Sequence, residues 1–213
     1  LHSTSRRQRQ MCIRDRFSGS EAGNALADVV FGAVNPSGKL PFTFPVRLED
    51  NGAHALGEYP GADKVKYNES IFVGYRWHDK EQLKPLFAFG HGLSYTAFAV
   101  GNVKADRTTL VPNGSIRISA DVTNTGDRAG AEVVQLYIGD EQSSLPRPVK
   151  ELKGFQKVSL NPGQTQTVTF EITPGMLQYY DAKGAWVAEP GAFTAYVGAA
   201  SDDIRGTVEF ELK

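Results

Sequence analysis

Acidic side chains in the first half of the chain could act as general acids, general bases or nucleophiles, because carboxyl groups serve in all three roles. They are Glu21, Asp28, Glu49, Asp50, Glu58, Asp63, Glu69, Asp79 and Glu81. No spacing among them singles out a pair. Glu21 fits an anion at a helix N-terminus, and Glu69 and Asp79 fit partners of nearby backbone or of Arg76. The sequence therefore predicts no catalytic residue in this chain.

The sequence also contains no motif typical of a metal site or a phosphate-binding site. The four histidines do not cluster, and no two of them have helical i, i+4 spacing; they are His2, His54, His78 and His91. The single cysteine, Cys12, excludes an internal disulfide and argues against a cysteine metal site. Gly90-His91-Gly92 lacks the strand–loop–helix context of a phosphate-binding loop. We expect neither a metal nor a cofactor.

Aromatic side chains form the more informative set, because aromatic faces can stack on the C–H faces of sugars. The candidates for the rim of a substrate pocket are Tyr67, Tyr75, Trp77 and His78. A second set, Tyr179, Tyr180 and Trp186, could form a carbohydrate-binding platform. The alternative for both sets is packing, at a domain junction for the first and between strands for the second. We favour packing in each case.

Elements that would position these side chains begin near Phe17. Ser20 is a plausible N-cap and Gly32 a plausible C′ residue of a helix of about three turns. Its apolar positions recur at helical spacing, at Ala25, Leu26, Val29 and Val30. After a turn at 35–38, alternation over residues 40–44 predicts a short edge strand. Polar residues 46–66 predict an exposed loop.

The segment from Tyr67 to Phe98 is less regular. Residues 67–79 could form a short helix followed by an extended stretch. Residues 85–98 are dense in glycine and aromatic residues, which is typical of a segment wedged between two packed units.

From about residue 96 the hydrophobic period changes to two, which indicates strands. Residues 116–122, 133–138, 167–172, 193–197 and 208–210 alternate in this way, with Asn, Gly and Pro turn signals between them. Short strands with turns every 8–12 residues or so indicate an antiparallel sandwich of one domain. The predicted fold class is therefore mainly β: a fibronectin type III-like (immunoglobulin-like) sandwich preceded by a partial α/β segment.

Composition excludes several classes of protein. The chain has 213 residues, a formal net charge of -1 and 40% hydrophobic residues, so it has no basic surface signature of nucleic-acid binding. No run of about 18 apolar residues predicts a membrane span. Residues 1–16 carry five arginines without an apolar core, and we interpret them as a non-native segment rather than a signal. The compartment stays open, since exported bacterial enzymes often lack disulfides.

Three blocks of sequence resemble glycoside hydrolase family 3, the β-glucosidase and β-xylosidase family. Gly19–Pro45 resembles a helix–turn–strand block near the end of its α/β sandwich domain. Ile71–Trp77 and Pro85–Tyr95 resemble its connector to the last domain, with Ser70 where many relatives carry glycine. Ala131–Gly198 resembles its fibronectin type III-like domain, most clearly at Glu151–Phe155 and Leu160–Gln164.

The resemblance implies that residues 17–95 are the end of the α/β domain with its connector, and that residues 96–213 are the fibronectin-like domain. It implies a parent that hydrolyses terminal β-linked sugars with retention, using a nucleophilic Asp in a barrel domain and an acid/base Glu upstream. Neither motif matches a position here, so this chain is expected to brace the catalytic domains and to be inactive alone. Its partners would be those domains and, through the parent, a β-glucoside or oligosaccharide.

Two other functions remain open. One is a standalone carbohydrate-binding or adhesion module, and the other is a structural module of a larger cell-surface protein, because a sandwich alone does not specify function. The fragment hypothesis makes a physical prediction that these do not: Leu26, Val29 and Phe42 should be unusually exposed, because the sheet that covers them in the family would be missing.

Overall fold

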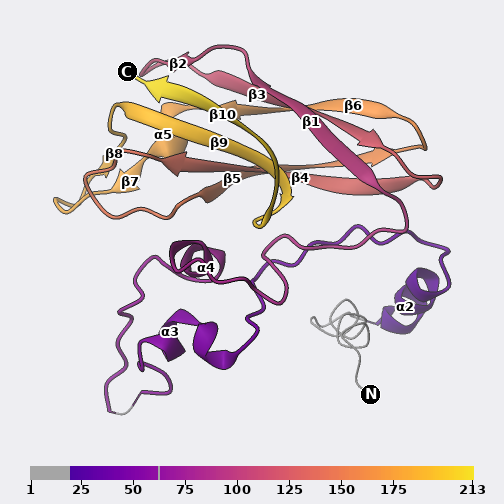
Figure 1. Cartoon of the computed structure of the whole chain (residues 1–213), viewed down its shortest axis with the longest axis horizontal. Coiled ribbons are helices and arrows are strands. Elements are labelled where there is room, and N and C mark those ends of the chain that lie inside the picture. Colours follow the sequence, from indigo (N-terminus) through magenta and orange to yellow (C-terminus); the bar gives the residue numbers. More distant parts are fainter. Residues whose placement is uncertain (1–19, 62) are drawn as a thin grey trace.

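A computed structural model describes residues 20–61 and 63–213 (Figure 1). The expected non-native segment 1–16 lies outside the described residues. The helices are α2 (Ala22–Val30), the 3-10 turn η1 (Leu48–Asp50), α3 (Gly52–Ala55), α4 (Tyr75–Lys80) and α5 (Pro174–Leu177). The strands are β1 (Phe98–Ala105), β2 (Thr109–Leu110), β3 (Ile116–Asn124), β4 (Gly130–Asp140), β5 (Glu151–Leu160), β6 (Thr165–Ile172), β7 (Tyr179–Tyr180), β8 (Trp186–Val187), β9 (Gly191–Ala200) and β10 (Asp203–Leu212).

The second half of the chain is the predicted sandwich. One sheet has the order β1-β3-β6 and the other β2-β10-β9-β4-β5, and a small hairpin pairs β7 with β8. All pairings are antiparallel except the short one between β2 and β10. Figure 1 shows the two sheets stacked as layers, with α2, α3 and α4 beneath one of them and α5 within the sandwich. The mainly β, fibronectin-like fold class is confirmed.

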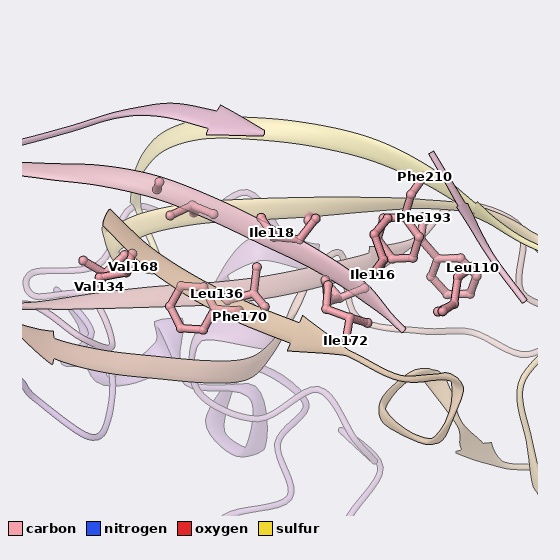
Figure 2. Packing of buried hydrophobic residues seen from close by; sticks show 14 of the residues in the cluster. Leu110, Ile116, Ile118, Val134, Leu136, Val168, Phe170, Ile172, Phe193 and Phe210 are labelled. Carbon is pink, nitrogen blue, oxygen red and sulfur yellow. The ribbon is translucent and has the colours of Figure 1, made fainter. Parts of the chain in front are cut away.

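The core lies between the two sheets and follows the alternation of the sequence. Strand β3 buries Ile116, Ile118 and Val122 completely, and their neighbours face outward. Figure 2 shows Leu136 of β4 and Phe170 of β6 pointing toward each other between the layers. Burial of such side chains stabilises the sandwich by about 1.5–3 kcal/mol each relative to exposure.

Strand β4 departs from the simple alternation. Its inward residues Val134, Leu136 and Ile138 are buried as predicted, but Gln135 and Tyr137 on the opposite face are also only 3% and 0% exposed. A strand is buried on both faces only where a second layer covers it. The covering layer here comes from residues that precede the sandwich.

Helix α2 confirms the helix predicted after residue 20, with Gly32 in the left-handed region (φ +80°) just past its C-terminus. Its N-cap is Glu21 rather than the predicted Ser20, because the first turn begins one residue later. None of the residues of this helix is buried in the described structure, so its apolar face is not fully covered by another element. Leu26 is 36% exposed and Phe42 is 40% exposed, as predicted. Val29 is only partly exposed.

Between residues 40 and 80 three predictions are wrong in detail. Residues 40–44 form no regular strand, because Pro41 and Pro45 cannot donate to a ladder; Phe44 bridges Phe87, and Leu40 exchanges backbone hydrogen bonds with Gly90 and His91. The predicted loop 46–66 contains η1, whose start is held by Arg47 and Asp50, and α3. Residues 67–79 reverse the predicted order: turns come first, and α4 follows.

Candidate functional site at the junction

We use the name connector for residues 71–95, which pack on the outer face of the five-stranded sheet. Figure 1 shows α4 lying beneath that sheet. Gly74 starts α4 with φ +61°, a backbone conformation that a residue with a Cβ rarely adopts. This turn brings the first residue of the helix, Tyr75, against β4 and β5.

Tyr75 is the main aromatic contact of the connector with the sandwich. Its ring stacks on Phe89 at 4.9 Å between centroids and meets the edge of Tyr137 at 5.8 Å. The β4–β5 ladder changes register at this point, and the Leu152 amide donates to the Tyr75 hydroxyl at 3.0 Å. The side chain therefore bonds to the backbone of β5 where the ladder is irregular.

Gln135 joins three segments through its buried amide. Its Nε2 donates to the carbonyl oxygens of Ala199 at 2.8 Å and Gly90 at 3.3 Å, and its Oε1 accepts from the Tyr137 hydroxyl. Burial raises the pKa of Tyr137, which keeps that hydroxyl protonated as a donor. The connector is thus bonded to the sheet through a fully used polar group.

Ion pairs surround this aromatic and amide contact. Lys150 pairs with Asp79 at 2.7 Å, and Glu151 pairs with Arg147 at 2.7 Å and with Arg76 at 3.1 Å. Burial raises the pKa of Asp79 although Lys150 opposes the shift. Asp79 therefore pairs with Lys150, and Arg76, its candidate partner from the sequence, pairs instead with Glu151 of β5. Alternation in a strand gives only its inward and outward faces, so Lys150 and Glu151 could not be assigned to the junction from pattern.

Glu151 makes the junction sensitive to acid. Burial alone raises its pKa, but Arg147, Lys153 and Arg76 together outweigh burial and hold the pKa below its ordinary value. A carboxyl with a lowered folded-state pKa adds stability above its unfolded pKa and loses it as the pH falls through the folded value. Glu151→Gln should therefore cost about 2 kcal/mol at neutral pH, and the difference from wild type should shrink below about pH 4.5.

Urea unfolding of wild type and Glu151→Gln across this pH range measures the effect, with exposed Glu209→Gln as the matched control. A gap between wild type and Glu151→Gln that stays constant into strong acid would contradict it.

The four predicted rim residues do not lie together. Trp77 and His78 are each 6% exposed on α4, half-buried Tyr75 precedes them, and Tyr67 is 78% exposed in a separate turn. The His78 Nδ1 lies 3.0 Å from the Gly74 carbonyl oxygen. Tyr75 packs at the junction with the sandwich, and Trp77 packs against α3 within the first piece. A role at a substrate rim stays a prediction for all four residues.

The ring of Trp77 lies so close to position 52 that only a glycine fits there without a shift. A Cβ on Gly52 of α3 would lie 3.0 Å from the Trp77 ring and 3.3 Å from the Cβ of Glu69. Trp77 Nε1, His78 Nε2 and the Glu69 Oε2 are buried without a hydrogen-bond partner in the described residues. Ser70 stands where many relatives carry glycine. Its φ is +54°, a backbone conformation that glycine would adopt without strain.

Three carboxylates of the first half have side-chain partners that hold the fold. Asp79 pairs with Lys150, Asp50 with Arg47, and Glu21 accepts from the Asn24 side chain at 2.6 Å. Across residues 20–61 and 63–213, no three His, Cys, Asp or Glu side chains gather as a metal site. The described helices include none that is long and apolar enough to span a membrane.

The aromatic residues of the β7–β8 hairpin divide between packing and exposure. Tyr179 is 8% exposed and lies under the Arg147 guanidinium at 4.8 Å. Tyr180 and Trp186 are directly opposed across the hairpin, with rings 5.6 Å apart and both largely exposed. Such a cross-strand pair stabilises a hairpin without any ligand.

Comparison with known proteins identifies both parts of the chain. Residues 11–95 match the sequence profile of the glycosyl hydrolase family 3 C-terminal domain, and residues 132–201 match that of a fibronectin type III-like domain. The chain belongs to glycosyl hydrolase family 3. The connector forms the end of the matched segment 11–95, and the sandwich contains the matched segment 132–201.

Relatives of this family 3 chain are β-glucosidases. It is 53% identical over 203 residues to the β-glucosidase BoGH3A of Bacteroides ovatus, covering 93% of this chain and 27% of that protein. It is 48% identical to the thermostable β-glucosidase B of Acetivibrio thermocellus, covering 90% of this chain and 26% of that protein. The chain thus spans about a quarter of the length of these relatives.

Solved structures of the family have the same fold over this region. The Bifidobacterium adolescentis GH3 β-glucosidase superposes with a TM-score of 0.83 at 38% identity, over 90% of this chain and 28% of that one. The Kluyveromyces marxianus β-glucosidase in complex with glucose gives 0.82 at 44% identity, over 91% of this chain and 23% of that one.

Proposed function

We propose that this chain serves as the bracing C-terminal part of an enzyme that hydrolyses terminal β-linked glucosides. The observation that carries the proposal is the junction, where Tyr75, Gln135 and the Lys150–Asp79 pair fix the connector to the sandwich. We divide the chain into a piece of the α/β domain at 17–95 and the fibronectin-like domain at 96–213. Its partners are the catalytic domains of the same parent chain and, through them, a β-glucoside or oligosaccharide.

Exposed apolar side chains support this role. In the first piece Phe31 is 87% exposed, Val73 is 61%, Val46 is 59% and Val30 is 55%. Large apolar side chains that stay exposed on several elements of one piece are typical of surfaces that another part of a protein covers. In the proposal this surface contacts the part of the parent that precedes residue 17, so the sandwich and connector hold the piece in place against it.

Retaining hydrolysis needs two carboxyl groups roughly 5–5.5 Å apart across the sugar. Asp50, Asp79 and Glu151 are engaged in ion pairs that hold the fold, and we place the reacting pair in the parent's other domains. Purified chain should therefore show no turnover of an aryl β-glucoside above buffer. Turnover that disappears in Glu69→Gln, the variant of the buried carboxylate with an unpartnered oxygen, would overturn the proposal.

A surface variant tests the predicted contact with the rest of the parent. Phe31→Ser should change the unfolding free energy of the isolated chain by no more than about 0.5 kcal/mol, because the side chain is already in water. In a chimera that fuses residues 17–213 to the preceding domains of the Bacteroides ovatus relative, the same change should lower the melting temperature by several degrees. Phe155→Ser, also exposed but on the sandwich, is the control. Equal effects of Phe31→Ser in both proteins would contradict the contact.

A further inference from the structure

A polar cavity lies at the junction, beside the contacts described above. Its volume is about 360 Å³, within the range of small-molecule sites, and such sites occur preferentially between domains. Residues from both pieces line it, among them Lys39, His91, Ser94, Glu132, Asp202 and Arg205. We call it the junction cavity.

The charges around the junction cavity nearly balance. Lys39 pairs with Glu132 at 2.6 Å, and both side chains are about 15% exposed. Arg205 forms a two-point pair with Asp203, and Asp202 adds a further carboxylate in the turn between β9 and β10. Three carboxylates disfavour an anion. Among the described residues, the cavity lining also contains no cluster of His, Cys, Asp and Glu side chains that could hold a metal ion. A neutral ligand with several hydroxyls suits these alternating donors and acceptors.

His91 adds a group whose hydrogen bonding is incomplete. Its Nε2 is buried and has no partner in the described structure, while its ring packs on Phe87 at 5.2 Å between centroids. Burial lowers the pKa of His91, although the nearby Asp202 carboxylate opposes the shift. A neutral imidazole offers one donor and one acceptor, which is what a hydroxyl pair requires.

The two loops that carry these residues are held closely together. A Cβ on Gly92 would lie 2.5 Å from the Gly38 carbonyl oxygen, and the Leu40 amide donates to the His91 carbonyl at 2.9 Å. The lining is therefore built before any ligand arrives, which reduces the ordering cost of binding.

We propose that the junction cavity is a binding site for a neutral polyol of monosaccharide size, with hydroxyls held by His91, Asp202 and the Lys39–Glu132 pair. Because the lining comes from both pieces, an occupant would bind only while the connector is docked on the sandwich. The site is independent of the proposed function: the cavity could fail to bind sugar while the chain still completes the enzyme.

D-glucose is the probe, titrated into the full 213-residue chain while amide chemical shifts are followed by NMR. We expect saturable shifts at Gly92, Ser94 and Asp202. Binding should weaken at least tenfold in His91→Phe, which keeps the ring packed on Phe87 but removes both nitrogens, and in Asp202→Asn. Asp127→Asn, at an exposed turn residue that does not line the cavity, changes the charge equally and should leave binding unchanged.

Absence of saturable shifts up to about 0.1 M glucose would overturn the proposal, because a dissociation constant above about 0.1 M would leave the cavity almost empty at lower glucose concentrations. Shifts caused by inorganic phosphate but not by glucose would also overturn it, because they would assign the cavity to an anion. If His91→Phe fails to fold, the comparison of Asp202→Asn with Asp127→Asn decides alone, because both lie on exposed turns.

Discussion

Gly90→Ala is expected to lower the free energy of unfolding by about 3 kcal/mol and to release the connector from the sandwich. Gly90 has φ +82°, a conformation that costs a residue with a Cβ roughly 1 kcal/mol. The new Cβ would also lie 2.4 Å from Oε1 and 2.8 Å from Cδ of Gln135. That amide is the end of a side chain, but it is buried and bonded to three groups, so displacing it costs about 2 kcal/mol more.

Gly163→Ala is the matched control for this variant. Gly163 has a similar φ of +73°, but nothing lies within 4 Å of the Cβ it would gain. It should therefore cost only the backbone penalty of about 1 kcal/mol. Urea unfolding of the two variants measures the difference. Equal losses would show that the contact between Gly90 and Gln135 does not stabilise the junction.

Tyr75→Ala is expected to cost about 3 kcal/mol, because it removes a ring packed on Phe89 and Tyr137 and leaves a gap at the sheet. Tyr75→Phe keeps the ring and should cost about 1 kcal/mol, since the Leu152 amide loses its acceptor. Tyr67→Ala, at a tyrosine that is 78% exposed, should leave stability nearly unchanged. Thermal and urea unfolding of the isolated chain measure all three.

The same variants separate the two interpretations of these aromatic residues. In the glucosidase chimera, a junction role for Tyr75 predicts lower stability with an unchanged KM in the fraction that stays folded. A rim role predicts a raised KM, for Tyr67→Ala as well as Tyr75→Ala. A raised KM for Tyr75→Ala at full stability would contradict the junction role.

Local patterns predicted the sandwich well because alternation is imposed by the core itself. Ile116, Ile118 and Val122 had to face inward for the domain to bury any surface, so their period was readable. The same pattern could not reveal that Tyr137 is buried on the other side of β4. That burial depends on Tyr75 and Phe89, which lie more than forty residues earlier in the chain.

The first piece was predicted less well for a related reason. Alternation at Leu40 and Phe44 indicated a strand, but the flanking prolines reduce the pairing with Phe87 to one bridge. Trp77 and His78 are buried on α4, and their sequence alone could not distinguish a buried helix from an open rim. Such choices depend on neighbours distant in sequence, as the contact of Trp77 with the backbone position of Gly52 shows.

The activity of the chimera tests the account most directly. Residues 17–213 would replace the matching last quarter of the Bacteroides ovatus β-glucosidase, and kcat/KM would be measured on an aryl β-glucoside. We predict that the chimera hydrolyses the substrate, that the relative truncated before this segment does not, and that Gly90→Ala lowers the activity of the chimera at elevated temperature while Gly163→Ala does so less. A chimera that folds but has no activity, beside an active relative with its own C-terminal segment restored, would contradict the role proposed for this chain.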